Sequence, residues 1–237
     1  MSIRRENYIR NLLVFSLELF TLFSLIFFLY RGEIDRILLC AATIVLILLP
    51  KAAERLFRCR LSLGLFLFCA FYAIGALLGH CWKFYYRFPF WDSMLHLMGG
   101  IAFAVLGVYL SQRAQGKPWM TVVFALCFSI AVAAIWEFFE YGMDRFFAMD
   151  MQNDTVVHSI HSYMLGDSLG ALGSIEQIEE ISIHGQELGL GGYLDLGLID
   201  TMNDMLFESL GALLYVLLFI FIGGKRQPIR PAVQIET

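Results

Sequence analysis

Six long apolar segments, separated by shorter polar ones, dominate the pattern of this chain. Each has a length near the roughly 17–25 residues that a helix needs to cross the hydrocarbon core of a bilayer, and the second is the shortest. Apolar runs of this length with few charges are typical of membrane spans, because a soluble surface helix keeps a polar face. The pattern therefore predicts an all-α bundle of six transmembrane helices. The predicted spans are residues 11–30, 36–50, 61–79, 92–110, 119–141 and 202–223.

A long acidic segment, residues 142–201, separates the fifth and sixth spans. Its many carboxylates are accompanied by one basic residue, Arg145. Alternating apolar and polar residues in its second half predict a small β-hairpin that turns at His184 to Gln186. Helical spacing of apolar residues within 156–172 favours a short helix. We predict a single polytopic membrane domain over residues 1–237, in which the acidic segment is an extracytoplasmic insertion.

The composition supports a membrane protein. Hydrophobic residues make up 59% of the chain and charged residues 16%, against about 45–50% and about 25% in an ordinary globular domain. No basic stripe interleaved with aromatic residues is present, which argues against a nucleic-acid partner. Lys and Arg favour cytoplasmic loops, and placing both termini inside puts twelve of the 17 there. We therefore expect a multi-pass protein of the cell inner (plasma) membrane, with the lipid bilayer as its surroundings and both termini cytoplasmic.

Acidic and imidazole side chains lie at the ends of three spans that charge bias assigns to the outer face. Each such group costs a few kcal/mol or more in a membrane, so these groups are rare unless they pair, line water or bind a ligand. At about 100° per residue, each set projects from one face of its helix. Glycines on the same faces allow close helix packing, and we expect the three faces to meet in one site. The residues are Asp92 and His96, then Glu137, Glu140 and Asp144, then Asp200, Asn203, Asp204 and Glu208.

A divalent metal ion is the positive partner that this set favours, because no Lys or Arg accompanies the carboxylates. Helix bundles that bind two metals also use inward carboxylates and histidines on facing helices. Oxygen ligands with one imidazole suit Mg, Mn, Fe or Zn, and the predominance of oxygen favours the harder ions. The sequence does not identify the ion. The expected ligands are Asp92, His96, Glu137, Glu140, Asp200 and Asp204, supported by Asp144, Asn203 and Glu208.

Two other interpretations of the polar set stay open. Some carboxylates could remain neutral and relay protons, as in ion-coupled transporters. Alternatively, the set is a hydrogen-bonded structural cluster at helix ends, in which Asp92 or Asp200 caps a helix N-terminus.

The sequence does not contain an HExxH or Walker motif. If the protein is an enzyme, the set favours metal-assisted hydrolysis or transfer on a lipid or lipid-linked substrate. If it is a transporter, the same carboxylates would bind the driving ion, although inverted repeats and broken paired spans are not evident. A third class is a non-catalytic membrane scaffold that presents the acidic loop. In that case alanine at His96 and Glu137 would leave the phenotype unchanged.

The resemblance to a known family is carried by three stretches, FWDSMLHLMGG (90–100), WEFFE (136–140) and GYLDLGLIDTMNDM (192–205). They resemble the uncharacterised bacterial inner-membrane proteins of the YjdF-like family. An aspartate and a histidine four residues apart, a helix with two glutamates and a helix with Asp-x-x-x-Asp occur in the same order. The resemblance covers the third to sixth spans. It implies an inner-membrane protein with this polar set, and it supplies no reaction.

Overall fold

The structure, a computed structural model, describes residues 3–56, 59–223 and 230–231. The contacts within the chain divide it into two compact units. The first unit consists of Met1–Ile130 and Phe207–Thr237, and the second consists of Ala131–Leu206.

Among the described residues, six helices are long and apolar enough to cross a membrane, so the predicted number of spans is confirmed. Within this described part, the strands form only two-stranded antiparallel pairs, as expected for an all-α fold. The spans begin and end within a few residues of the predicted bounds in most cases. The helices are α1 (Ile3–Arg31), α2 (Ile34–Leu56), α3 (Leu63–Ala76) with the π-helical turn η1 (Leu77–Cys81), the short α4 (Phe84–Arg87), α5 (Trp91–Arg113), α6 (Pro118–Phe147) and α7 (Leu198–Phe221).

Three helices extend six or more residues beyond their predicted bounds, and one of them is α6, which continues past residue 141 to Phe147. α1 begins eight residues before the predicted start at residue 11 because its polar first turns are also helical. There Arg10 donates a hydrogen bond to Glu6 at i−4 (2.5 Å), a pairing that supports a helix. α2 continues past Pro50 to Leu56, although proline removes one backbone hydrogen bond. Hydropathy therefore locates the spans. It does not detect the polar helical turns that make the helices longer than the apolar segments.

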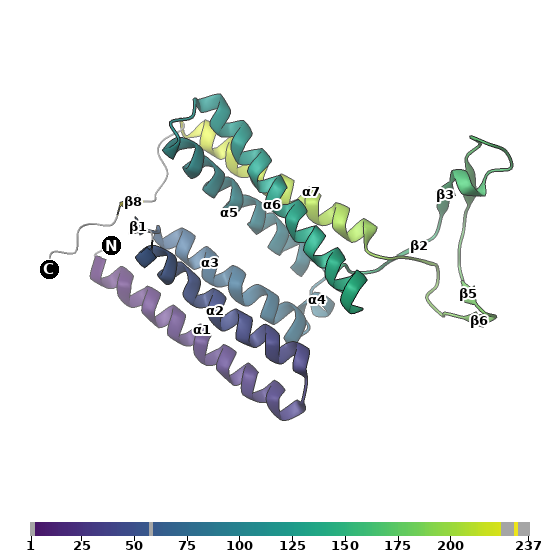
Figure 1. Cartoon of the computed structure of the whole chain (residues 1–237), viewed down its shortest axis with the longest axis horizontal. Helices are drawn as coiled ribbons and strands as arrows, with labels where there is room; N and C mark the ends of the chain where they lie inside the picture. The colour runs from purple at the N-terminus through teal and green to yellow at the C-terminus, as the bar shows by residue number, and fades with distance from the viewer. Residues whose placement is uncertain (1–2, 57–58, 224–229, 232–237) are drawn as a thin grey trace. The chain divides into compact units, whose positions relative to one another are not determined.

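In the first unit, α1, α2 and α3 pack side by side (Figure 1). Large apolar side chains from all three helices are buried at this interface. Close packing of such groups stabilises the layer through dispersion contacts. The most fully buried members of this core are Phe28, Cys40, Ile47, Phe66 and Leu77, each at most 1% exposed.

A buried arginine ties the start of α1 to α2. Arg10 is only 3% exposed, and it donates hydrogen bonds to Glu6 (2.5 Å), Glu54 (2.6 Å) and the carbonyl oxygen of Leu61 (2.5 Å). Its guanidinium carbon also lies 4.8 Å from the centroid of the Phe66 ring. Two carboxylates and an aromatic face therefore compensate for the loss of hydration around this charge.

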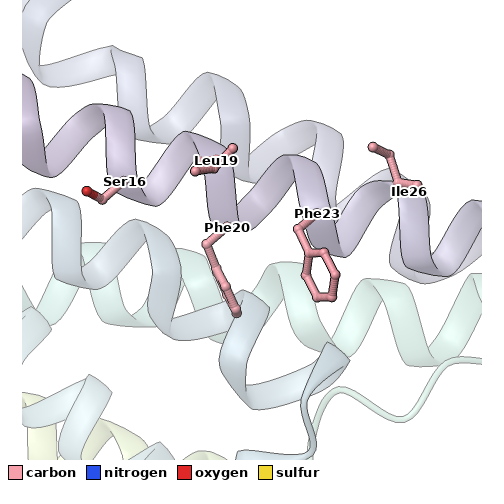
Figure 2. Close-up of a pocket in the computed structure, with 5 residues that line it drawn as sticks. All are labelled: Ser16, Leu19, Phe20, Phe23 and Ile26. Carbon is pink, nitrogen blue, oxygen red and sulfur yellow. The ribbon is translucent and has the colours of Figure 1, made fainter.

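After its polar first turns, the exposed surface of α1 is mainly apolar, as a lipid-facing surface should be. It contains an open groove, which Figure 2 shows along the helix. Large exposed apolar surfaces of soluble proteins mark interaction sites, whereas on a membrane span they contact acyl chains. Only one hydroxyl group is present among the lining residues, so the groove offers no set of groups for chemistry. The lining residues are Ser16, Leu19, Phe20, Phe23 and Ile26.

Short antiparallel strand pairs organise the segment between α6 and α7 in the second unit. The predicted hairpin is confirmed, with His184 and Gly185 at positive φ in its two-residue turn and Gln186 already in the next strand. The helix expected within 156–172 is reduced to one 3₁₀ turn because neighbouring residues pair as strands. The elements here are β2 (Thr155–Val157), β3 (Ile160–Ser162), η2 (Tyr163–Leu165), β4 (Gly173–Ile175), β5 (Ser182–Ile183), β6 (Gln186–Glu187) and β7 (Tyr193–Asp195); the first unit contains the pair β1 (Cys59–Arg60) and β8 (Arg230–Pro231).

Candidate metal centre

Two glutamates of α6, both within the second unit, are buried. Glu137 and Glu140 are three residues apart, a spacing that places two side chains on the same face of a helix. They are only 4% and 8% exposed, whereas the intervening Phe138 and Phe139 are 74% and 48% exposed. The phenylalanines thus occupy the outer face of α6, and the two carboxylates turn inward.

Asp204 of α7 joins these glutamates, and we call the three residues the carboxylate cluster. Asp204 is 2% exposed, whereas the adjacent Asn203 is exposed on another face of α7. One oxygen from each of the three carboxylates lies within 4.8 Å of the others. An ion with oxygen ligands at about 2.0–2.6 Å keeps those ligands within about 5 Å of one another. The spacing of the carboxylate cluster therefore fits a single cation.

The sequences of the two helices supply little positive charge. α7 contains no Lys, Arg or His, and α6 contains one basic residue, Arg145, in its last turn. Three carboxylates at this spacing repel one another strongly where the surroundings are of low polarity. A cation bound among them would remove this repulsion.

An indole group orients one of the carboxylates. The N–H of Trp136 donates a hydrogen bond to Oε1 of Glu140, with a donor–acceptor distance of 2.8 Å. Hydrogen bonds of this kind, made to a ligand rather than to the ion, fix the orientation of metal-binding groups. This role of Trp136 was not predicted, although its i, i+4 spacing from Glu140 is a signal for it.

A second polar group, which we call the histidine cluster, lies in the first unit and consists of Asp92, His96 and Glu208. Nε2 of His96 is 3.7 Å from Oδ1 of Asp92, and its Nδ1 is 3.6 Å from Oε2 of Glu208. His96 is 5% exposed and Glu208 is 2% exposed. Tyr72 of α3 also borders this group, because a Cβ atom at Gly99 would lie 3.4 Å from its hydroxyl and 3.6 Å from Oε2 of Glu208. Tyr72 was not predicted, and no spacing in the sequence indicates it.

Glycines place α5 against the first-unit part of α7. A Cβ atom at Gly100 would lie 1.9 Å from the carbonyl oxygen of Glu208, and one at Gly211 would lie 2.0 Å from that of Leu97. Such distances are impossible for a real side chain, so the two backbones touch only because these residues are glycines. The close packing predicted from the small residues is confirmed, and it holds Glu208 beside His96.

Aromatic side chains fix the start of α5, directly before Asp92. The indole N–H of Trp91 donates to the carbonyl oxygen of Gly75 on α3 (3.2 Å). The ring of Phe84, from α4, packs edge-on against Trp91 with 4.9 Å between centroids. The first turn of α5 is therefore held in position by packing.

Two other predicted residues, Asp144 and Asp200, hold the loop rather than joining the carboxylate cluster. Asp144 accepts hydrogen bonds from the backbone N–H groups of Met151 (2.6 Å) and Gln152 (2.9 Å). Asp200 accepts one from the backbone N–H of Asn153 (2.7 Å). These bonds fasten the first residues of the loop to the ends of α6 and α7 within the second unit.

Negative charge accumulates where the loop leaves α6. Partial removal from water raises the pKa of Asp154, and the charges of Asp150, Asp144, Asp195 and Asp200 raise it further. Carboxylates therefore repel one another near the start of the acidic loop, as well as within the carboxylate cluster.

The chain belongs to the family described as "Predicted membrane protein (DUF2238)", whose model matches residues 12–225. The match includes both the carboxylate cluster and the histidine cluster. The resemblance to an uncharacterised membrane protein family is therefore confirmed, and the chain is a membrane protein with several apolar helices. Neither the curated proteins nor the solved structures contain a match to it.

Proposed function

We propose that this membrane protein binds a divalent cation through the carboxylate cluster. The observation that carries the proposal is the approach of three buried carboxylates, with one oxygen of each within 4.8 Å of the others. Ionised groups in an apolar span are costly unless they have a counter-charge. One divalent ion supplies that charge at the point where the three oxygens converge.

The ligand atoms define the class of ion. All three side chains of the carboxylate cluster offer oxygen, the ligand that Mg²⁺, Mn²⁺ and Ca²⁺ prefer. Zn²⁺ and Cu²⁺ sites in proteins usually include histidine or cysteine. We therefore propose Mg²⁺ or Mn²⁺ as the resident ion, and Mn²⁺ is the practical probe because it is paramagnetic.

The reaction that we propose is metal-assisted hydrolysis or transfer on a lipid or lipid-linked substrate. A bound divalent ion lowers the pKa of a coordinated water molecule and polarises an ester or phosphoryl oxygen. The helices that carry the ligands, α6 and α7, are continuous over 30 and 24 residues. Carriers commonly bind their ions at interrupted helices, so the unbroken helices favour an enzyme over a transporter.

We also propose that the protein lies in the inner membrane with both termini in the cytoplasm, in keeping with the bias of Lys and Arg. In a cysteine-free background, a membrane-impermeant maleimide should label Leu169→Cys in intact cells, because Leu169 is fully exposed in the loop. Gln115→Cys, in the exposed turn between α5 and α6, should be labelled only after the cells are opened. The opposite pattern would reverse the orientation.

A titration with Mn²⁺ tests the proposed cation site. In detergent-purified protein, Mn²⁺ should quench the fluorescence of Trp136, because its indole N–H is bonded to Glu140. In calorimetry, the variant Glu140→Gln should bind Mn²⁺ about 10–100-fold more weakly than the wild type. Loss of a group that only orients a metal ligand already lowers metal affinity by about this factor. Trp136→Phe should remove most of the quenching, whereas Trp119→Phe, 17 residues earlier on α6, should not.

The matched control is Glu18→Gln, which makes the same chemical change in the apolar part of α1. It should leave Mn²⁺ affinity unchanged, since Glu18 is not part of the carboxylate cluster. Equal affinities for the wild type and Glu140→Gln would remove the proposal. In sealed vesicles the wild type should not carry Mn²⁺ across the bilayer, and a flux lost in Glu140→Gln would favour a transporter instead.

A further inference from the structure

The histidine cluster contains a buried carboxylate oxygen that needs a partner. Glu208 is 2% exposed, and within the described residues its Oε1 atom has no hydrogen-bond partner. A buried acceptor without a partner costs about 1–3 kcal/mol, and more when it is charged. The other oxygen, Oε2, faces the ring of His96. The carboxylate is thus directed at the imidazole without being fully satisfied by it.

The distance between these groups fits shared ligation better than a hydrogen bond. Nδ1 of His96 and Oε2 of Glu208 are 3.6 Å apart, whereas an N–H···O hydrogen bond spans about 2.7–3.2 Å. Two ligands that each lie about 2.1 Å from an ion are about 3.0 Å apart at a right angle and about 3.6 Å apart at 120°. A single ion placed between the two side chains would therefore match the observed separation.

The far side of the imidazole faces a carboxylate, at a distance longer than a direct hydrogen bond. Nε2 of His96 faces Oδ1 of Asp92 at 3.7 Å. Histidines that bind metals usually present their second nitrogen to a carboxylate or carbonyl group, which selects the tautomer and fixes the ring. Asp92 lies one turn before His96 on α5, where Trp91 anchors the helix. It is a positioning residue in this arrangement.

We propose that His96 and Glu208 bind a second divalent cation, with Asp92 orienting the histidine. Mixed nitrogen and oxygen ligation suits Mn²⁺, Fe²⁺ or Zn²⁺. Two protein ligands leave coordination positions for water or for a substrate oxygen, the feature that distinguishes catalytic from purely structural metal sites. The contact between α5 and α7 at Gly100 keeps the two ligands together. This second cation site goes beyond the proposed function. An experiment can exclude it without excluding the site at the carboxylate cluster.

The experiment counts bound Mn²⁺ by the loss of the free-ion electron paramagnetic resonance signal in detergent-purified full-length protein. The wild type and the control Glu18→Gln should bind two ions per chain. His96→Gln should bind one ion, with quenching of Trp136 fluorescence retained. Glu140→Gln should also retain one strongly bound ion, but without the quenching. Glu208→Gln provides a second test of the same site with little change in volume, and it should behave like His96→Gln.

The outcomes separate the two proposals. One ion in the wild type and one in both His96→Gln and Glu208→Gln would overturn the second site and leave the first intact. Two ions in both of these variants would overturn it as well. An unchanged count and unchanged quenching in Glu140→Gln would instead remove the first site. Gel filtration of each variant establishes that a lower count does not come from unfolded protein.

Discussion

Replacing Glu137 and Glu140 together by glutamine is expected to weaken Mn²⁺ binding by more than about 100-fold. Loss of a single group that only orients a ligand costs about 10–100-fold, and this variant removes two of the three carboxylates that converge within 4.8 Å. Glutamine keeps the volume and retains one oxygen, so the change tests charge and ligation rather than packing. Calorimetry or electron paramagnetic resonance gives the affinity directly.

The same variant should also separate ion binding from stability. A ligand present at 100 times its Kd stabilises the folded protein by about 2.7 kcal/mol. Mn²⁺ should therefore raise the unfolding midpoint of the wild type, and a chelator should reverse the rise. In the double variant the carboxylate cluster no longer binds Mn²⁺ tightly. Any rise in its unfolding midpoint would then come from Mn²⁺ bound at another site. A midpoint that responds equally in both proteins would show that the stabilising ion binds elsewhere.

Replacing Arg10 by alanine is expected to destabilise the protein by about 3–5 kcal/mol. Removing one member of a buried ion pair leaves the other charge without compensation. Here two carboxylates, Glu6 and Glu54, would lose the guanidinium that bonds them at 2.5 and 2.6 Å. The cation–π contact with Phe66 would disappear as well. Unfolding by sodium dodecyl sulfate in mixed micelles measures the change in the free energy of unfolding.

The control for Arg10→Ala is Lys51→Ala. Lys51 belongs to α2, near the same end of α1, and its side chain donates an exposed hydrogen bond to Asn11 (2.8 Å). Surface changes of this kind usually alter stability by less than about 0.5 kcal/mol. If both variants lost equal stability, the buried network around Arg10 would have no special role.

The spans could be predicted because a bilayer imposes a length and a composition that hydropathy detects directly. Their ends could not, because polar turns form helix for other reasons. Glu6 and Arg10 extend α1 through a side-chain pair, and the residues after Pro50 continue α2 although their composition is polar. The hairpin at His184 was predictable, since a tight turn needs residues that tolerate positive φ.

The carboxylate cluster could be predicted only in part. The i, i+3 spacing of Glu137 and Glu140 gives their shared face, and the pairing with Asp204 follows once α6 and α7 pack. The same helical spacing also selects Asp144 and Asp200, which bond to the loop backbone instead. Periodicity treats all five carboxylates alike, because it does not show which of them will accept hydrogen bonds from the backbone of a loop.

The most direct test of the cation site is an anomalous difference map at the manganese absorption edge, from crystals grown with Mn²⁺. We expect a peak about 2.0–2.6 Å from carboxylate oxygens of Glu137, Glu140 and Asp204. The peak at these residues should be missing in crystals of the double glutamine variant. A wild-type map with no density there, and with the three side chains turned apart, would exclude a cation site at these residues.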